Sequence, residues 1–416
     1  MTFANTATEI QESEIFSAHK GGKICIETTA ELNDPHSLAV AYTPGVAAVS
    51  QAIAAQPALA ERYTWASRLV AVVTDGTAVL GLGDVGPAAA LPVMEGKAVL
   101  LKRLGGVDAI PLVLDTTDND EIIETLVRLR PSYGAVSLED VAAPRCFELE
   151  RRLVEALDCP VMHDDQHGTA IAVLAALRGA CAVVERPLQD RRVVVSGAGA
   201  AGLACARILL AAGVSDVTVL DSRGIINRGR PDMNTAKTEV AERTNPRSLS
   251  GGLAEAIRGA DVFVGLSSSQ VPEHLIAAMA PDGIVLALSN PHPEIAPHVA
   301  ARHVAVVGTG GSDFPNQVIN MLASPGMYRG ALDAGARRIT EHMKLAAAQA
   351  IAEVAAGDLS ADRIVPHSLD SRVMPAVANA VARAAIEDST RSLVSRSAAF
   401  SKAEQRYDHT TSEHEG

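Results

Sequence analysis

A glycine-rich turn between an apolar strand and an apolar helix is the feature that most constrains how this chain can fold. The strand RVVVS, residues 192–196, runs into GAGAAG at 197–202, and the apolar stretch LACARILLAAG follows. A further strand, VTVLD, ends at Asp221. A lone GxGxxG occurs by chance, but a strand, the glycines, a helix and an acid about 20 residues further on form the full context of a dinucleotide-binding unit. The sequence therefore predicts a Rossmann domain.

The residues of this turn have separate roles. Gly197 permits the tight turn, Gly199 lets the backbone approach a pyrophosphate, and Gly202 lets the helix pack on the strand. Ala200 and Ala201 open the helix, whose first N–H groups point at the diphosphate. We predict that these five residues bind the dinucleotide.

The residues after the second strand leave the choice of cofactor open. Asp221 is expected to accept hydrogen bonds from the adenosine ribose and to repel a 2′-phosphate, which favours NAD. Arg223, Arg228 and Arg230 follow closely, and a guanidinium can receive that phosphate bidentately. We therefore predict NAD or NADP, with Arg223 contributing more to NADP binding than to NAD binding.

Strands also alternate with helices before this unit, as expected for a mostly parallel sheet covered on both faces. The predicted strands of this first run are 69–74, 110–114, 135–138 and 160–162, and those of the second run continue at 261–265, 284–288 and 304–308. The predicted fold class is α/β, with an N-terminal substrate and metal domain at residues 1–164 and a Rossmann NAD(P)-binding domain at 165–319. Helices within 320–390 have no strand of their own, so we expect them to fold back on the first domain, before a polar, mobile tail at 391–416.

Every strand of the first run is followed by an acid. These acids are Asp75, Asp115, the doublet Glu139–Asp140 and the doublet Asp164–Asp165. A single Asp after a strand is usually a turn former or a helix cap. Adjacent carboxylates repel one another unless a cation lies between them, so the two doublets predict a site for Mg²⁺ or Mn²⁺ in the crevice beyond the strand ends.

The segment His163-Asp-Asp-Gln-His167 allows a second interpretation, because two histidines four apart share one face of a helix and suit zinc. His163 ends a strand and His167 precedes a glycine, so the segment is a strand-to-helix junction. A spacing of four residues there does not indicate that both histidines share one face of a helix. We prefer Asp165 as a ligand for a hard cation, with both histidines as local hydrogen-bonding groups.

Composition excludes several classes of function. Aromatic residues make up 3% of the chain and the net charge is -13, which disfavours nucleic acids and anionic membranes as partners. The most apolar stretch noted, 169–184, is interrupted by Arg178, and the polar start MTFANTATEIQESE is unlike a signal peptide. The five cysteines match no metal or disulfide spacing. We expect a cytoplasmic enzyme with reduced thiols, acting on a small molecule.

Longer motifs identify a family. AYTPGVA, VVTDGTAVLGLGDVGP, LPVMEGKAVLLK, LEDVAAPRCFELE, HDDQHGTAIA and the GAGAAG turn resemble those of bacterial malic enzymes of the short form, over residues 21–386. The resemblance implies oxidative decarboxylation of malate to pyruvate and CO₂, with NAD or NADP and Mg²⁺ or Mn²⁺, by a homodimer or larger homo-oligomer.

The resemblance also assigns residues, two of which no local pattern had indicated. It implies that Tyr42 is the catalytic acid and Lys97 the catalytic base, the latter with a pKa lowered by the cation. The implied metal ligands are Glu139, Asp140 and Asp165, with Asp164 beside them. Asn290 and Asn320 fall on asparagines that contact substrate, and Asn290 also ends a Rossmann strand where the cofactor is expected.

The chain departs from the family pattern TGRSDYPNQVNNVLAFPG, which here reads TGGSDFPNQVINMLASPG. Gly311 replaces an arginine, Ile319 an asparagine and Ser324 a phenylalanine, and His292 replaces the threonine of NPTPE. These changes bear on substrate preference more than on reaction type.

Three alternatives stay open at this point. One is a malolactic-type reaction or an oxaloacetate decarboxylase of the same family. Another is a metal-independent amino-acid dehydrogenase, which has no use for the acidic doublets. The third, a non-catalytic NAD sensor, needs neither Lys97 nor Tyr42.

Overall fold

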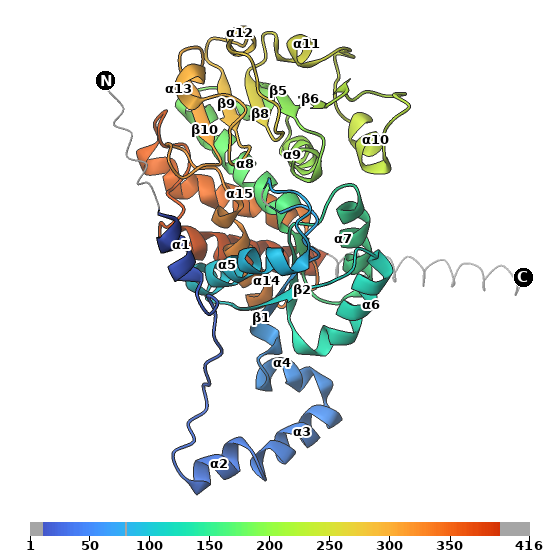
Figure 1. Ribbon diagram of the computed structural model, residues 1–416, viewed down its shortest axis with the longest axis vertical. Helices are drawn as coiled ribbons and strands as arrows, with labels where there is room; N and C mark the ends of the chain where they lie inside the picture. Colours follow the sequence, from blue (N-terminus) through green and yellow to red (C-terminus); the bar gives the residue numbers. More distant parts are fainter. Residues whose placement is uncertain (1–10, 80, 392–416) are drawn as a thin grey trace, which may run out of the picture.

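In a computed structural model of the protein, the residues described are 11–79 and 81–391. The tail expected to be mobile, 391–416, lies beyond these residues except for residue 391. Two parallel-stranded sheets with helices around them form the body of the molecule (Figure 1). The predicted α/β fold class is confirmed.

The first sheet has the strand order β2-β1-β3-β4, and all its pairs are parallel. Its strands are β1 (Leu69–Thr74), β2 (Asp108–Val113), β3 (Ala135–Leu138) and β4 (Val161–His163). The chain adds β2 on one side of β1 and then crosses to place β3 on the other. Such a switch point opens a crevice at the carboxyl ends of β1 and β3, where open α/β sheets bind their ligands.

Helices cover both faces of this sheet. On one face α6 (Asn119–Leu129) and α7 (Arg145–Ala156) bury their apolar stripes, and Asp118 caps α6 through the backbone N–H groups of Asp120 and Glu121. On the other face lie α5 (Pro87–Gly105) and α8 (Asp164–Val183). The apolar α8 shares one buried core with both sheets, so the predicted domain limit at 164 and 165 falls at the start of this central helix.

The second sheet has the order β10-β9-β8-β5-β6-β7. Its strands are β5 (Arg192–Ser196), β6 (Asp216–Asp221), β7 (Gly224–Ile225), β8 (Val262–Gly265), β9 (Ile284–Ala287) and β10 (Val306–Thr309). All pairs are parallel except β6 with β7, a short antiparallel addition that the sequence did not predict. The helix α9 (Ala200–Ala211) follows the GAGAAG turn, and the chain switches sides between β5 and β8, as in a Rossmann fold.

The C-terminal helices return to the first part of the chain. The helix α14 (Ser324–Asp333) packs against α5, and α15 (Glu341–Ala355) packs against α8. A last helix, residues 373–391 of the described part, crosses α14 so closely that a Cβ on Gly326 would lie 2.6 Å from Val377. A loop that ends at the N-cap Thr340 separates α14 from α15.

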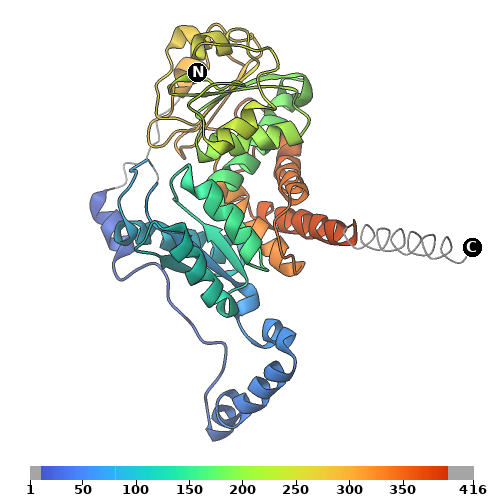
Figure 2. The ribbon, with the colours of Figure 1, turned by 90° about the vertical axis from the view of Figure 1, so that its right-hand side faces the viewer.

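The N-terminal part is different. The helices α2 (Pro35–Ala41), α3 (Gly45–Ala55) and α4 (Ala60–Tyr63) form an arm, residues 35–63, that stands clear of both sheets in two perpendicular views (Figures 1 and 2). None of these helices has a buried residue. The helix α1 (Glu12–His19) precedes the arm. Just after α1, the backbone N–H of Lys23 donates to Glu95 Oε2 of α5 at 2.9 Å, which ties this end of the chain to the first domain.

Within the described residues, one stretch is apolar enough and long enough to cross a membrane, Pro35–Ala55 in the arm. It is not one helix, because α2 ends at Ala41 and α3 begins at Gly45, with a turn through Tyr42 between them. Composition and length alone are weak grounds for a membrane span.

The remaining elements are short and connect the larger ones. They are η1 (Pro57–Leu59), η2 (Ala66–Arg68), η3 (Arg130–Ser132), η4 (Leu188–Asp190), α10 (Thr235–Ala241), α11 (Leu253–Ile257), α12 (Glu273–Ile276), α13 (Pro297–Ala300), η5 (Asn320–Leu322) and η6 (Ala356–Asp358).

Candidate active site

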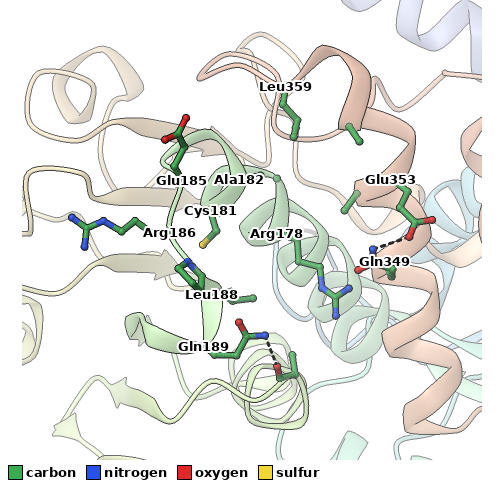
Figure 3. Close-up of a pocket in the computed structure, with 15 residues that line it drawn as sticks. Arg178, Cys181, Ala182, Glu185, Arg186, Leu188, Gln189, Gln349, Glu353 and Leu359 are labelled. Atoms are coloured by element: carbon green, nitrogen blue, oxygen red, sulfur yellow. Dashed lines mark hydrogen bonds between the residues drawn. The ribbon is translucent and has the colours of Figure 1, made fainter.

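A cleft of about 1560 Å³ lies between the two sheets. Side chains from the first sheet and its helices line one wall, among them Lys97, Asp140 and Asp165. The Rossmann sheet contributes the opposite wall, and the predicted substrate residues Asn290 and Asn320 both line the cleft. A separate cavity of about 640 Å³ at the far end of α8, lined by Arg178, Glu185, Arg186 and Glu353, contains none of the predicted site residues (Figure 3).

Lys97 is the centre of the charged part of this cleft. It projects from α5, and its Nζ lies 2.5 Å from Asp164 Oδ2 and 3.1 Å from Glu139 Oε2, with the side chain 18% exposed. Burial lowers the pKa of the Lys97 ammonium, but the Asp164 and Glu139 carboxylates raise it by more, so the net shift is upward. A lysine on a largely apolar helix thus proves to be fixed by two buried acids.

The acidic doublets at the ends of β3 and β4 meet around this ammonium. We call Glu139, Asp140, Asp164 and Asp165 the carboxylate cluster. Asp140 has a φ of 54°, a left-handed conformation that costs a non-glycine residue free energy and is common at functional sites. In this conformation its N–H donates to Asp165 Oδ2 at 2.8 Å, so the two doublets are joined directly.

The cluster has an excess of negative charge. One ammonium, that of Lys97, is shared by the carboxylates of Glu139 and Asp164, and the charge of Asp165 also acts on it. Burial raises the pKa of Glu139 well above its usual range, and the charges of Asp164 and Asp165 add to this effect. Buried like charges are stabilised by a cation, and an all-oxygen donor set suits Mg²⁺ or Mn²⁺. Glu139, Asp140 and Asp165 therefore fit a divalent cation by chemistry, although in the described residues no three acidic, histidine or cysteine side chains are gathered closely enough to hold one as placed.

The other two acidic strand ends do not join this cluster. Asp75 is buried in an ion pair with Arg145, and Asp115 is exposed. Of the first sheet's strands, therefore, only β3 and β4 supply carboxylates to the site.

The histidines belong to a second network, behind the carboxylate cluster. His163 is fully buried and its Nε2 lies 3.0 Å from Asp165 Oδ2, whereas His167 lies 3.1 Å from Glu150 Oε2. Glu150, on α7, also accepts the backbone N–H of His163 at 2.7 Å and the side-chain amide of Gln166 at 2.9 Å.

Sequence reasoning missed Glu150 because it lies inside an amphipathic helix among exposed charges. Burial raises its pKa, but the His167 interactions lower it by more, to about 2. Glu150 therefore anchors the junction that carries Asp164 and Asp165.

The glycines of the dinucleotide turn lie as their predicted roles require. Gly197 has a φ of 120°, and a Cβ on Gly202 would collide with the carbonyl oxygen of Gly197. Nothing lies within 4 Å of a Cβ placed on Gly199, so the backbone is open to a ligand there. Ala200 and Ala201 begin α9, and Ala201 lines the cleft.

Asp221 is enclosed by cations. Arg230 pairs with both of its oxygens, Lys237 Nζ lies 2.6 Å from Oδ2, and the N–H of Arg223 donates to Oδ1 at 2.9 Å. Burial raises the pKa of Asp221, but these hydrogen bonds lower it well below its usual range. The Arg223 guanidinium instead pairs with Asp232. Lys237 carried no signal in the sequence, because it lies 16 residues beyond Asp221 and on a different element, α10.

The loops that carry Asn290 are held by Glu294, another residue that sequence reasoning missed. Its fully buried carboxylate accepts the N–H groups of Ser267 at 2.9 Å and Ser289 at 3.2 Å, both of which line the cleft. Burial raises its pKa. Across the cleft, Asn320 begins η5, beside the N-terminal turn of α8.

Tyr42 is a predicted catalytic residue that this chain does not bring to Lys97. It caps the C-terminus of α2 in the arm, is 66% exposed, and does not line the cleft. Figures 1 and 2 show the arm on the far side of the first sheet from the Rossmann domain. A single chain thus assembles Lys97 with its acids but leaves Tyr42 apart.

Two family models match the chain, one on each side of the start of α8. A family model described as the N-terminal domain of malic enzyme matches residues 21–122, and one described as the malic enzyme NAD binding domain matches residues 166–386. The two matches together span most of the chain.

Individual relatives are similar over nearly the same length. An NAD-dependent malic enzyme of Geobacillus stearothermophilus is 50% identical over 372 residues, which is 89% of this chain and 78% of that protein. A bifunctional malic/malolactic enzyme of Bacillus subtilis is 50% identical over 370 residues, 88% of this chain and 90% of that protein. The crystal structure of an NAD-dependent malic enzyme from Thermotoga maritima superposes with a TM-score of 0.85 at 42% identity, covering 90% of this chain and 99% of that one.

Proposed function

The chain belongs to the malic enzyme family, and we propose that it converts malate to pyruvate and CO₂ with NAD or NADP and a divalent cation, Mg²⁺ or Mn²⁺. The observation that carries this proposal is the Lys97 ammonium, held by buried carboxylates on the wall of a cleft whose other wall is a dinucleotide-binding sheet. Residues predicted for the metal, the substrate and the cofactor line this cleft together with Lys97: Asp140, Asp165, Ala201, Asn290 and Asn320.

The reaction needs a base for the malate hydroxyl and an acceptor for the hydride from the same carbon. We assign the hydroxyl proton to Lys97, and its contact with the buried Asp164, which holds the lysine side chain, supports this role. A dinucleotide bound at the GAGAAG turn would supply the hydride acceptor. Glu139, Asp140 and Asp165 would hold the divalent cation, whose Lewis acidity would stabilise the negative charge left on the substrate when CO₂ departs.

The charge on Lys97 has to change for this role. As placed, the acids raise its pKa, whereas the sequence hypothesis invoked a lowered pKa. A dication held by Glu139, Asp140 and Asp165 would offset the charges of Glu139 and Asp165, two of the carboxylates that raise the pKa of Lys97, and would thereby favour the neutral amine that a base requires.

The last step protonates the enol of pyruvate at its methylene carbon, and we assign it to Tyr42. Because the arm exposes apolar residues, among them Leu38, Val40, Val46 and Val49, it needs a surface to cover it. We propose a homodimer in which a second copy of this chain supplies that surface and receives Tyr42 near its Lys97. We further propose that the protein acts on a small-molecule substrate in the cytoplasm and has no nucleic acid or membrane partner.

A malolactic-type reaction is the second candidate, because the Bacillus subtilis relative is described as bifunctional. In such a reaction reduced cofactor is not released. A metal-independent amino-acid dehydrogenase remains the alternative from another class, and it does not explain the carboxylate cluster.

One assay separates these candidates. The purified chain is supplied with malate and Mn²⁺, with NAD and NADP in separate reactions, and both reduced cofactor and pyruvate are measured. We expect equal amounts of the two products and loss of both in EDTA. Lactate without reduced cofactor favours the malolactic reaction, and activity that survives EDTA excludes the metal.

The Asp165→Ala variant tests the metal assignment itself. It is expected to lose turnover and Mn²⁺ binding while still binding NAD, because the dinucleotide turn belongs to the other sheet. Near-normal turnover in this variant rejects Asp165 as a ligand.

A further inference from the structure

Ser324 makes a contact with the carboxylate cluster that the reaction outlined above does not use. It is the first residue of α14, and its Oγ donates a hydrogen bond to Asp164 Oδ1. The other oxygen of that carboxylate, Oδ2, is the one that holds Lys97 Nζ at 2.5 Å. Asp164 is fully buried and Ser324 is 6% exposed. One buried carboxylate is thus shared between a hydroxyl and the ammonium.

The surrounding backbone is shaped to allow this contact. Gly168 lies one turn beyond Asp164 in α8, and a Cβ there would collide with Asp164 Oδ1. Ser324 Oγ also lies 3.0 Å from the carbonyl oxygen of Asn320. A hydroxyl has a single proton, and an ionised carboxylate can only accept, so the proton of Ser324 points to Asp164.

Ser324 is also a departure from the family pattern, in which the resemblance places a phenylalanine at this position. Beside the serine is a small enclosed cavity of about 10 Å³, lined also by Lys97, Ser137 and Glu139. A phenyl ring fills more space than a serine and donates no hydrogen bond. This chain therefore has a hydrogen-bond donor where the family pattern has an apolar ring, directly behind Lys97.

We propose that Ser324 is a positioning residue for Lys97, whose hydroxyl fixes the Asp164 carboxylate so that Oδ2 stays against the Lys97 ammonium. The inference rests on the proposed function, in which Lys97 removes the proton of the malate hydroxyl. A base must lie within hydrogen-bond reach of the proton it removes, so a rotated Asp164 misplaces it.

The two halves of the reaction differ in their need for that base. Malate oxidation removes a hydroxyl proton. Oxaloacetate has a carbonyl instead, so its decarboxylation to pyruvate needs no such step. Ser324 therefore contributes to the rate of malate oxidation and not to the rate of oxaloacetate decarboxylation by the same protein.

The test compares Ser324→Ala with Ser324→Thr, which keeps the hydroxyl and places its methyl group beside the small cavity. Ser368→Ala is the matched control, since Ser368 is also a buried serine, and it donates to Gln317 Oε1 at 3.1 Å. A hydrogen bond to a charged group is worth enough to change a rate roughly tenfold or more. We expect Ser324→Ala to lower kcat for malate oxidation about tenfold, with unchanged KM for malate and unchanged oxaloacetate decarboxylation. Ser324→Thr is expected to recover most of the loss, and Ser368→Ala to match the wild type.

Three results overturn the inference: equal losses in both reactions, a higher KM with kcat unchanged, or a threonine variant no better than alanine. A wild-type protein that does not oxidise malate at all contradicts the proposed function instead. In that case crystal structures of the wild type and Ser324→Ala still decide about Ser324. An Asp164 side chain turned away from Lys97 in the variant supports the positioning role, and an unmoved one rejects it.

Discussion

The surroundings of Lys97 and the arm that carries Tyr42 represent two opposite ways of presenting a functional residue. Lys97 is held by Asp164 and Glu139, and Asp164 is held in turn by Ser324. Tyr42 lies on an arm without a buried residue, at a turn between two short apolar helices. Lys97 and its neighbouring carboxylates are therefore organised within one chain, whereas Tyr42, the proposed catalytic acid, lies apart from them. The following experiments test this difference.

The largest effect is expected at Lys97. Lys97→Ala should lower malate oxidation by ~10²–10⁴-fold or more, because it removes a positioned base and the ion that neutralises two buried acids. Binding of NAD, measured by fluorescence, should be unchanged. Lys102→Ala is the control, since Lys102 lies on the same helix but pairs with Asp108 at the surface. Similar losses in both variants would show a general effect on α5.

Tyr42→Phe tests the other region. If Tyr42 delivers the proton to the methylene carbon, the variant should exchange pyruvate methyl hydrogens with deuterium roughly 10²-fold more slowly, with Mn²⁺ and reduced cofactor present. Exchange at the wild-type rate would remove Tyr42 from this role.

Mixing inactive chains tests whether the arm reaches a second copy. In a mixed dimer of Tyr42→Phe and Lys97→Ala chains, one site receives both intact residues if Tyr42 is supplied by the partner. Random pairing then restores about a quarter of the wild-type activity, because half of the dimers are mixed and each has one intact site. No recovery is expected if each arm folds onto its own chain, and that outcome would contradict the shared site.

A smaller effect is expected at Asp221, which resembles Lys97 in being held by ion pairs. Lys237 and Arg230 cover the carboxylate that would otherwise repel a 2′-phosphate. Lys237→Ala should therefore lower the ratio of kcat/KM for NADP to that for NAD by about tenfold, the effect of one lost charge contact. Arg223→Ala is the comparison, because the Arg223 guanidinium already pairs with Asp232. If a variant loses kcat/KM equally with NAD and with NADP, the substituted residue does not contact the 2′-phosphate.

The smallest effect is a stability change at Glu150. Its folded pKa, about 2, lies below the usual value of 4.5, so its contribution to stability is complete above pH 4.5 and is lost as the pH falls towards 2. Glu150→Gln should lower Tm by a few degrees at neutral pH and by less in acid. Glu155→Gln, which changes an exposed pair with Arg151 on the same helix, should have almost no effect. An unchanged Tm in Glu150→Gln would contradict the anchoring role of this carboxylate.

Much of the fold could be predicted because strands and glycine turns depend on local sequence. The predicted strands at 69–74, 135–138 and 192–196 agree with β1, β3 and β5 to the residue. The helices within 320–390 were predicted without their individual bounds, and the structure places a break between α14 and α15 that ends at the cap Thr340. The two-residue strand β7 was missed, since so short an element has no periodicity of its own.

For the site, the sequence by itself determined which residue types are available and where they stand along the chain. The acidic doublets after β3 and β4 indicated a cation site because parallel strands end at a common edge. The glycines of the turn were assigned separate roles because only glycine tolerates that φ or that closeness. Lys97 and Tyr42 were identified by resemblance alone, because a single lysine or tyrosine carries no local pattern.

Tertiary structure alone decided which of these groups meet. The contacts of Lys97 with Asp164, of Asp164 with Ser324, and of Asp221 with Lys237 join residues 67, 160 and 16 positions apart. Contacts of this kind depend on how helices dock, and docking follows buried apolar surface rather than the charges it brings together. The arm follows the same principle, because its apolar side chains are exposed in the single chain and have not yet docked on a surface. What Tyr42 contacts is therefore decided by the surface on which the arm docks.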